Sequence, residues 1–209
     1  MRCIVVVFTV FCFLTSGANA ACKKLNLNSE FLSPYESDTQ KWSVGEPHYY
    51  DDPNLGFSIN LKTKDTKIDF YVYNLGIENI RDGMTEQLLR QSVSEMFQVL
   101  NYNETFPTSP PYLLPKSFFQ GSEKYLVHNA VYVTQERNPV NIVSIVSIGF
   151  DGKCFQKLRY TKELISKDRD IKNYFNNPLH DAETLAAILG FSGLVKILNQ
   201  ELYRIGYYK

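Results

Sequence analysis

Three histidines and two pairs of neighbouring aspartates are the residues of this chain that could support acid–base or metal chemistry. The histidines are His48, His128 and His180, and the pairs are Asp51/Asp52 and Asp168/Asp170. No two histidines have the short spacing of a zinc site, and both aspartate pairs lie in polar stretches typical of solvated turns. A glycosidase would need two carboxylates at a defined separation across a cleft. We therefore predict no catalytic residue, no metal site and no cofactor.

The sequence also lacks the motifs of several common enzyme classes. The chain contains no Cys-x-x-Cys pair, no phosphate-binding loop and no dinucleotide fingerprint. The Gly-Phe-Ser-Gly run at 190–193 has the wrong spacing for a Gly-x-Ser-x-Gly nucleophile elbow, and it lies inside a helical pattern. Binding is therefore a better expectation than catalysis.

Aromatic and basic residues on two expected strands form a different candidate site. Tyr71 and Tyr73 share one face of a strand, and Lys157 and Arg159 share one face of a later strand, because side chains alternate along a strand. If the two faces coincide, the sheet suits an anionic or carbohydrate ligand through stacking and charge. The alternative is that a helix covers these residues and leaves only their tips in water. The sequence leaves both interpretations open.

Two stretches of alternating apolar and polar residues position the tyrosines. Their apolar members are Phe57, Ile59, Leu61, Ile68, Phe70 and Val72. A period of two is the pattern of a half-buried strand, and the polar residues 62–67 favour a turn between the stretches. The pattern predicts a hairpin with one face on the core and with Tyr71 and Tyr73 on the opposite face.

A second β-rich section, from about residue 124 onward, positions the basic pair. Residues 140–150 are apolar on both faces, as expected of a central strand. Asp151-Gly152 follows, a strong signal for a two-residue hairpin turn, and it leads into a strand over 154–161. The charged stretch after that strand favours a short helix over 162–172.

An amphipathic helix is expected over residues 83–100. It starts after Asp82-Gly83 or at Thr85, since these residues are good N-caps. Its apolar residues recur at three- and four-residue spacing, which buries one face.

A C-terminal helix is expected over residues 181–204, with Asp181 as its N-cap. Gly190 and Gly193 interrupt its apolar stripe, and a close helix–sheet contact or a kink would explain them. Charged residues within this stretch argue against a membrane span.

These elements predict an α+β fold with a single antiparallel sheet of about five to six strands, packed against the two helices. One domain over 55–209 accounts for them, since domains commonly have about 100–200 residues. Residues 21–54 are interpreted as an N-terminal arm, with a short strand near Trp42.

Residues 1–20 have the pattern of a secretory signal peptide. Arg2 supplies a positive charge, residues 4–14 are almost all apolar, and Ala-Asn-Ala at 18–20 is a small-x-small cleavage site. The apolar core is too short for a bilayer, which takes about 20 residues. We therefore expect an exported protein, periplasmic or secreted, with no transmembrane segment after cleavage.

Two cysteines remain after cleavage of the signal peptide, Cys22 and Cys154. An even pair in an exported chain favours one disulfide. Two free buried thiols are an alternative, and so is a lipid anchor on Cys22. For the anchor, Asn19 stands where a lipobox has an aliphatic residue.

The charge balance bears on the partners. The chain has 22 basic and 22 acidic residues, so it exerts no long-range attraction on nucleic acid. We expect an envelope or extracellular protein or a glycan as partner, and no nucleic acid.

Several short motifs resemble a group of uncharacterised exported bacterial proteins with a PsbP-like α+β fold. The motifs are Leu-Gly-Phe-Ser-Ile at 55–59, Phe-Tyr-Val-Tyr-Asn-Leu-Gly at 70–76, Ile-Arg-Asp-Gly at 80–83 and Phe-Gln-Lys-Leu-Arg-Tyr at 155–160. The resemblance implies an antiparallel sheet flanked by helices, an accessory or binding role, and no catalytic residues.

The functional expectation is an exported, non-enzymatic binding or accessory protein, with Tyr71, Tyr73, Lys157 and Arg159 as candidate ligand-binding residues. One alternative is a secreted hydrolase that uses dispersed carboxylates, with the proline-rich loop 101–117 as a lid. Another is a secreted factor that acts on host material.

Overall fold

The structure is a computed structural model, and it describes only part of the chain. The described residues are Cys22, Leu25, Leu27, 29–36, 41–81, 83–102, 106–107, 112–113, 129–137, 140–151, 153–164 and 182–207. The expected signal peptide over 1–20 lies outside them, as do most of the loop 101–117 and the strand start at 124–128. So do the caps Asp82 and Asp181.

Among the described residues, nine antiparallel strands form one sheet in the order β1-β3-β4-β9-β8-β7-β5, with β2 also paired to β3 and β6 to β7. The five long strands are β3 (Phe57–Lys62), β4 (Thr66–Tyr73), β7 (Asn129–Arg137), β8 (Val140–Phe150) and β9 (Phe155–Leu164). The short ones are β1 (Ser43–Val44), β2 (His48–Tyr49), β5 (Phe106–Pro107) and β6 (Tyr112–Leu113). The α+β prediction with a single antiparallel sheet is confirmed.

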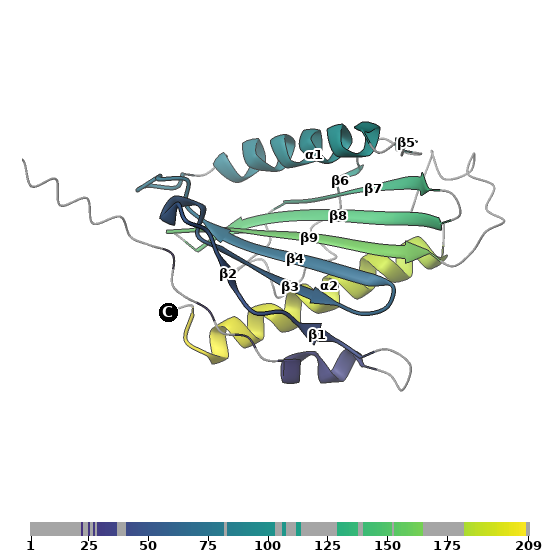
Figure 1. The fold of residues 1–209 in the computed structure, drawn as a ribbon, viewed down its shortest axis with the longest axis horizontal. Helices are drawn as coiled ribbons and strands as arrows, with labels where there is room; N and C mark the ends of the chain where they lie inside the picture. The colour runs from purple at the N-terminus through teal and green to yellow at the C-terminus, as the bar shows by residue number, and fades with distance from the viewer. Residues whose placement is uncertain are drawn as a thin grey trace, which may run out of the picture.

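Two helices cover opposite faces of the sheet (Figure 1). They are α1 (Met84–Tyr102) and α2 (Ala182–Arg204), and they begin and end within two residues of the predicted bounds. The chain leaves β4, crosses one face as α1 and returns through β7, β8 and β9, so that β9 ends beside β4. Helix α2 then crosses the other face.

The two predicted hairpins supply the main core. In the β3–β4 hairpin the alternating residues from Phe57 to Val72 face α2 and are buried. Strand β8 lies between β9 and β7 and is buried on both faces, as predicted for a central strand. Strand β9 continues to Leu164, so the expected helix over 162–172 is wrong for its first three residues. Pairing with β8 holds them extended.

The N-terminal segment packs against the α2 face of the sheet. Cys22, Leu25, Leu27 and Leu32 belong to the buried core, and Leu32 lies in the 3-10 helix η1 (Ser29–Tyr35). The Cys22–Cys154 disulfide, which joins positions 132 residues apart, fixes this segment to the start of the β9 region. Disulfides persist mainly in oxidising compartments, which favours an exported protein.

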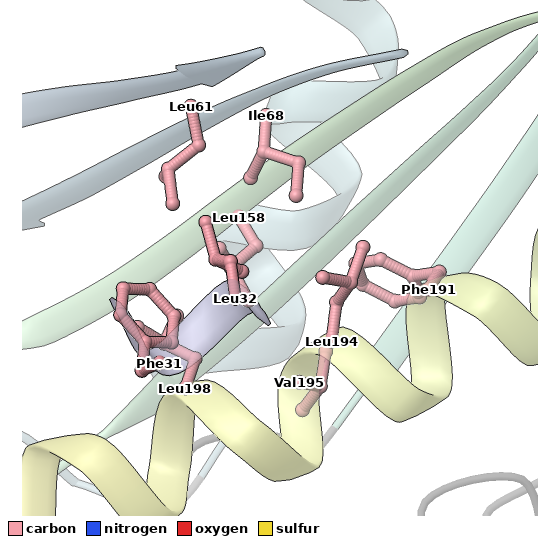
Figure 2. Close-up of a pocket in the computed structure, with 9 residues that line it drawn as sticks. All are labelled: Phe31, Leu32, Leu61, Ile68, Leu158, Phe191, Leu194, Val195 and Leu198. Atoms are coloured by element: carbon pink, nitrogen blue, oxygen red, sulfur yellow. The ribbon is translucent and has the colours of Figure 1, made fainter. Parts of the chain in front are cut away.

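A small void lies where η1, the sheet and α2 meet. Figure 2 shows Leu32 of η1, Leu158 of β9 and Phe191 of α2 directed into this space. It has room for about 10 Å³ and its lining is entirely apolar. A space of that size barely admits one water molecule. We therefore interpret it as ordinary core packing.

Helix α2 uses its apolar residues for the core. By length and composition the segment Leu185–Arg204 could cross a membrane, but half of it is buried inside the structure. A helix that covers a sheet passes the same test, so the expected absence of a span stays a prediction.

The glycine at position 190 is not required by a close helix–sheet contact. A Cβ at Gly190 would lie 3.9 Å from the Tyr160 hydroxyl, which is an ordinary contact distance.

A polar cluster ties the β3–β4 turn to the end of β9. The Asp65 carboxylate accepts hydrogen bonds from Thr63 (3.0 Å), Thr66 (2.8 Å) and the Lys162 ammonium (3.1 Å). Burial works to raise the pKa of Asp65, but the hydrogen bonds of Thr66 and Lys162 outweigh it and the pKa is lowered. The folded state therefore prefers the ionised carboxylate.

This preference predicts a pH-dependent contribution to stability. A lowered pKa gives stability that is complete above the unfolded-state pKa, about 3.9, and is lost as the pH falls through the folded-state pKa. Asp65→Asn should therefore cost about 1 kcal/mol at pH 7, and the cost should vanish in acid. Urea unfolding of both proteins from pH 7 to pH 2 measures this difference. Glu86→Gln is the control, because Glu86 lies in an exposed pair with Arg90. A loss for Asp65→Asn that is the same at every pH contradicts the assignment.

Candidate functional site

The pairing of β4 with β9 brings the candidate residues onto one face of the sheet. Tyr71 lies directly opposite Lys157, and Asp69 lies opposite Arg159. Directly opposed residues of an antiparallel pair share a face, so the two faces that the sequence treats separately coincide. The Lys157 ammonium lies 5.7 Å from the centroid of the Tyr71 ring, within the range of a cation–π contact.

Helix α1 covers one end of this face and leaves the other open. Phe155 is completely buried beneath Leu89 of α1. The centroid of the Tyr73 ring lies 5.7 Å from the centroid of the Phe155 ring. Further along β9, Lys157 and Arg159 are only partly buried. Each of the two interpretations that the sequence left open therefore holds for one end: core beneath α1, and accessible surface beyond it.

A cleft of about 240 Å³ lies at the boundary between these two ends. Its sheet side is formed by Tyr50, Tyr71, Tyr73 and Lys157. Leu88, Gln91 and Ser92 of α1 form the other side, and the exposed side chains of Leu55 and Leu75 complete the lining. We call this space the tyrosine cleft. Arg159 is not part of its lining and lies one cross-strand pair further along the same face.

A tight turn places Tyr50 and Leu55 at the cleft. Asp52 caps the 3-10 helix η2 (Pro53–Leu55) by accepting a hydrogen bond from the Asn54 backbone N–H at 2.9 Å. The predicted role of Asp52 in a turn is confirmed. The Tyr50 N–H donates to the Gly56 carbonyl at 3.1 Å, and the Tyr50 hydroxyl donates to Ser58 at 3.2 Å.

The electrostatic environment keeps Tyr71 protonated. Burial raises the pKa of Tyr71, the charge of Asp69 and the Tyr50 phenol add to this, and Arg159 opposes it. A phenol with an ordinary or a raised pKa is protonated at neutral pH, so this hydroxyl is a hydrogen-bond donor there. Both carboxylate oxygens of Asp69 are engaged, one by the Asn60 amide at 2.7 Å and one by Lys67 at 3.0 Å.

The described lining offers means of binding: aromatic faces, apolar leucine side chains, hydroxyl groups and one ammonium group. Within the described residues no group of three histidine, cysteine, aspartate or glutamate side chains could hold a metal ion. The exposed Asp51 and Asp52 belong to the η2 turn. Asp168, Asp170, His128 and His180 lie outside the described residues.

Sequence reasoning identified Tyr71, Tyr73 and Lys157 but missed the rest of the cleft. Leu55 and Leu75 follow turn residues and are 44% and 43% exposed, and an apolar residue beside a turn was the one available signal. The α1 residues carry no such signal, because their contribution depends on where the helix crosses the sheet.

Comparison with protein-family models, with curated proteins and with solved structures gives no match. The PsbP-like relationship therefore stays a prediction.

Proposed function

We propose that this chain is an exported, non-catalytic binding protein, periplasmic or secreted, and that the tyrosine cleft is its ligand site. The observation that carries the proposal is the meeting of Tyr71, Tyr73 and Lys157 in one open cleft of about 240 Å³. Aromatic faces next to an ammonium group favour an anionic or carbohydrate ligand. The ligand belongs to an envelope or extracellular molecule, a glycan or a protein. The order of sheet and helices supports a PsbP-like relationship as part of the same proposal.

Protein-observed NMR with a panel of small molecules tests the proposal. The panel contains neutral saccharides, carboxylates, phosphates and amines, and each is added to the isotopically labelled, disulfide-bonded protein. We expect the shifts caused by binding to concentrate on Tyr71, Leu75 and Gln91 and to spare the exposed face of α2. Every ligand should be recovered chemically unchanged.

Two results contradict the proposal. Shifts that are absent, or that scatter over the surface, remove the cleft as a ligand site. Conversion of a bound panel member into a product favours the secreted hydrolase instead.

A further inference from the structure

Leu75, in the lining of the tyrosine cleft, has an unusual backbone conformation. Among the described residues it is the one non-glycine residue with a positive φ, at 55°. This left-handed conformation costs free energy for a residue with a Cβ, because the Cβ crowds the following carbonyl oxygen. Leu75 gains little from the core in return, since its side chain is 43% exposed. Such strain is a reason to look for a function.

A set of hydrogen bonds holds Leu75 in place beside a second exposed leucine. The backbone N–H groups of Asn74 and Leu75 donate to the Asn54 carbonyl at 3.2 Å and 2.9 Å. The Asn74 side chain accepts from the Gly76 N–H at 3.0 Å. Because Asn54 directly precedes Leu55, these bonds hold the backbones of the two leucines close together, and both side chains line the cleft. We call these two exposed side chains the leucine rim.

The interior of the cleft combines apolar walls with one cation. Tyrosine rings and Leu88 form the walls, and Lys157 is the cation among the described lining residues. Partial burial of Lys157 strengthens its attraction for an anion, because a less polar environment weakens screening. The space of about 240 Å³ is below the roughly 300–1,000 Å³ of pockets for drug-sized ligands. A space of this size suits an apolar group of about one aromatic ring or a short alkyl chain.

We infer that the ligand is a small amphipathic monoanion whose apolar body lies between the leucine rim and the tyrosines and whose anionic group pairs with Lys157. This inference rests on the proposed function and names the ligand class of the same cleft. A sugar fits less well, because each buried hydroxyl needs a hydrogen-bond partner and the leucine rim supplies none. The strained Leu75 then acts as a specificity residue that presents an apolar side chain where glycine would be the relaxed choice.

Calorimetric titration with two matched probes tests the inference. The probes are 4-phenylbutyrate and its neutral amide, 4-phenylbutanamide, which differ in the anionic group alone. The disulfide-bonded protein should bind the carboxylate about tenfold more tightly than the amide. Lys157→Met keeps the apolar stem of the side chain and should abolish this preference. Leu75→Gly should weaken the binding of both probes about tenfold without lowering the urea midpoint of unfolding, because glycine relieves the backbone strain.

Matched controls come from the opposite face of the molecule. Leu189→Ala and Lys196→Met alter exposed residues of α2 and should change neither affinity. Equal affinity for the two probes, no binding of either, or a preference that survives Lys157→Met overturns the inference. If other panel members still bind in the cleft, only the ligand class is wrong; if none does, the proposed function fails with it.

Discussion

Replacing Cys22 and Cys154 together by serine lowers the free energy of unfolding by about 5 kcal/mol. The disulfide joins positions 132 residues apart, and a cross-link over so long a loop removes a large share of the entropy of the unfolded chain. Both cysteines are also buried, so the loss includes contacts of the N-terminal segment with the core. The total free energy of unfolding of a domain is typically about 5–15 kcal/mol. Urea unfolding of the variant and of the parent protein measures the change.

The reduced parent protein is the control for this prediction. Reduction should reproduce the behaviour of the double serine variant, since both lack the cross-link and keep all other side chains. The intact mass without reductant separates the paired cysteines from free thiols and from a lipid on Cys22. Equal urea midpoints for the oxidised and the reduced protein would show that the disulfide does not stabilise the fold.

The fold was predictable where its signals are local. Alternation from Phe57 to Val72 specified the β3–β4 hairpin, and the apolar run of β8 specified a strand buried on both faces. Three- and four-residue spacing identified both helices. Each of these signals depends on residues within one element or one turn, so a single sequence contains all of the required information.

The pairing of distant elements was not predictable in the same way. Tyr71 and Lys157 are partners in the β4–β9 ladder, yet no local pattern states which strand lies beside which. The two-residue strand β1 confirms the short strand expected near Trp42. Strand β2, in the same segment, was not expected, because two residues are too few to show a period. Packing of Leu25 and Leu27 into the core on the α2 side of the sheet is likewise a tertiary effect.

The candidate site follows the same division. Alternation along each strand puts Tyr71 and Tyr73 on one face of β4, and Lys157 and Arg159 on one face of β9. The register between the two strands decides that Tyr71 lies opposite Lys157. The cleft exists because α1 packs over Phe155 and then runs on over β8 and β7, which leaves the Lys157 part of that face uncovered. The face on which a strand residue lies can be predicted from the sequence. The lateral position of a helix on a sheet cannot, because it depends on all the side chains that pack between them.

Gly56→Ala should be a severely destabilising substitution. Gly56 has a φ of 63°, and a Cβ added to it would lie 1.9 Å from the carbonyl oxygen of Val72. That oxygen belongs to the backbone of β4, so no side-chain rotation relieves the clash. Strain at a special backbone position costs about 1–3 kcal/mol by itself, and the clash adds to it. We expect a loss of at least about 3 kcal/mol in the free energy of unfolding, measured by urea denaturation.

Gly206→Ala is the control for this prediction. Gly206 also has a positive φ, 69°, but nothing lies within 4 Å of its added Cβ, so this variant reports the cost of a positive φ without a clash. The excess loss of Gly56→Ala over Gly206→Ala then reports the clash with Val72 together with the added cost of the Gly56 ψ of −119°. The Gly56 carbonyl also accepts the Tyr50 N–H, so any Gly56→Ala protein that still folds should have a distorted tyrosine cleft and weaker probe binding. Equal losses for the two variants would mean that β3 and β4 can separate at Gly56, and the close approach that positions Tyr50 and Leu55 would then be dispensable.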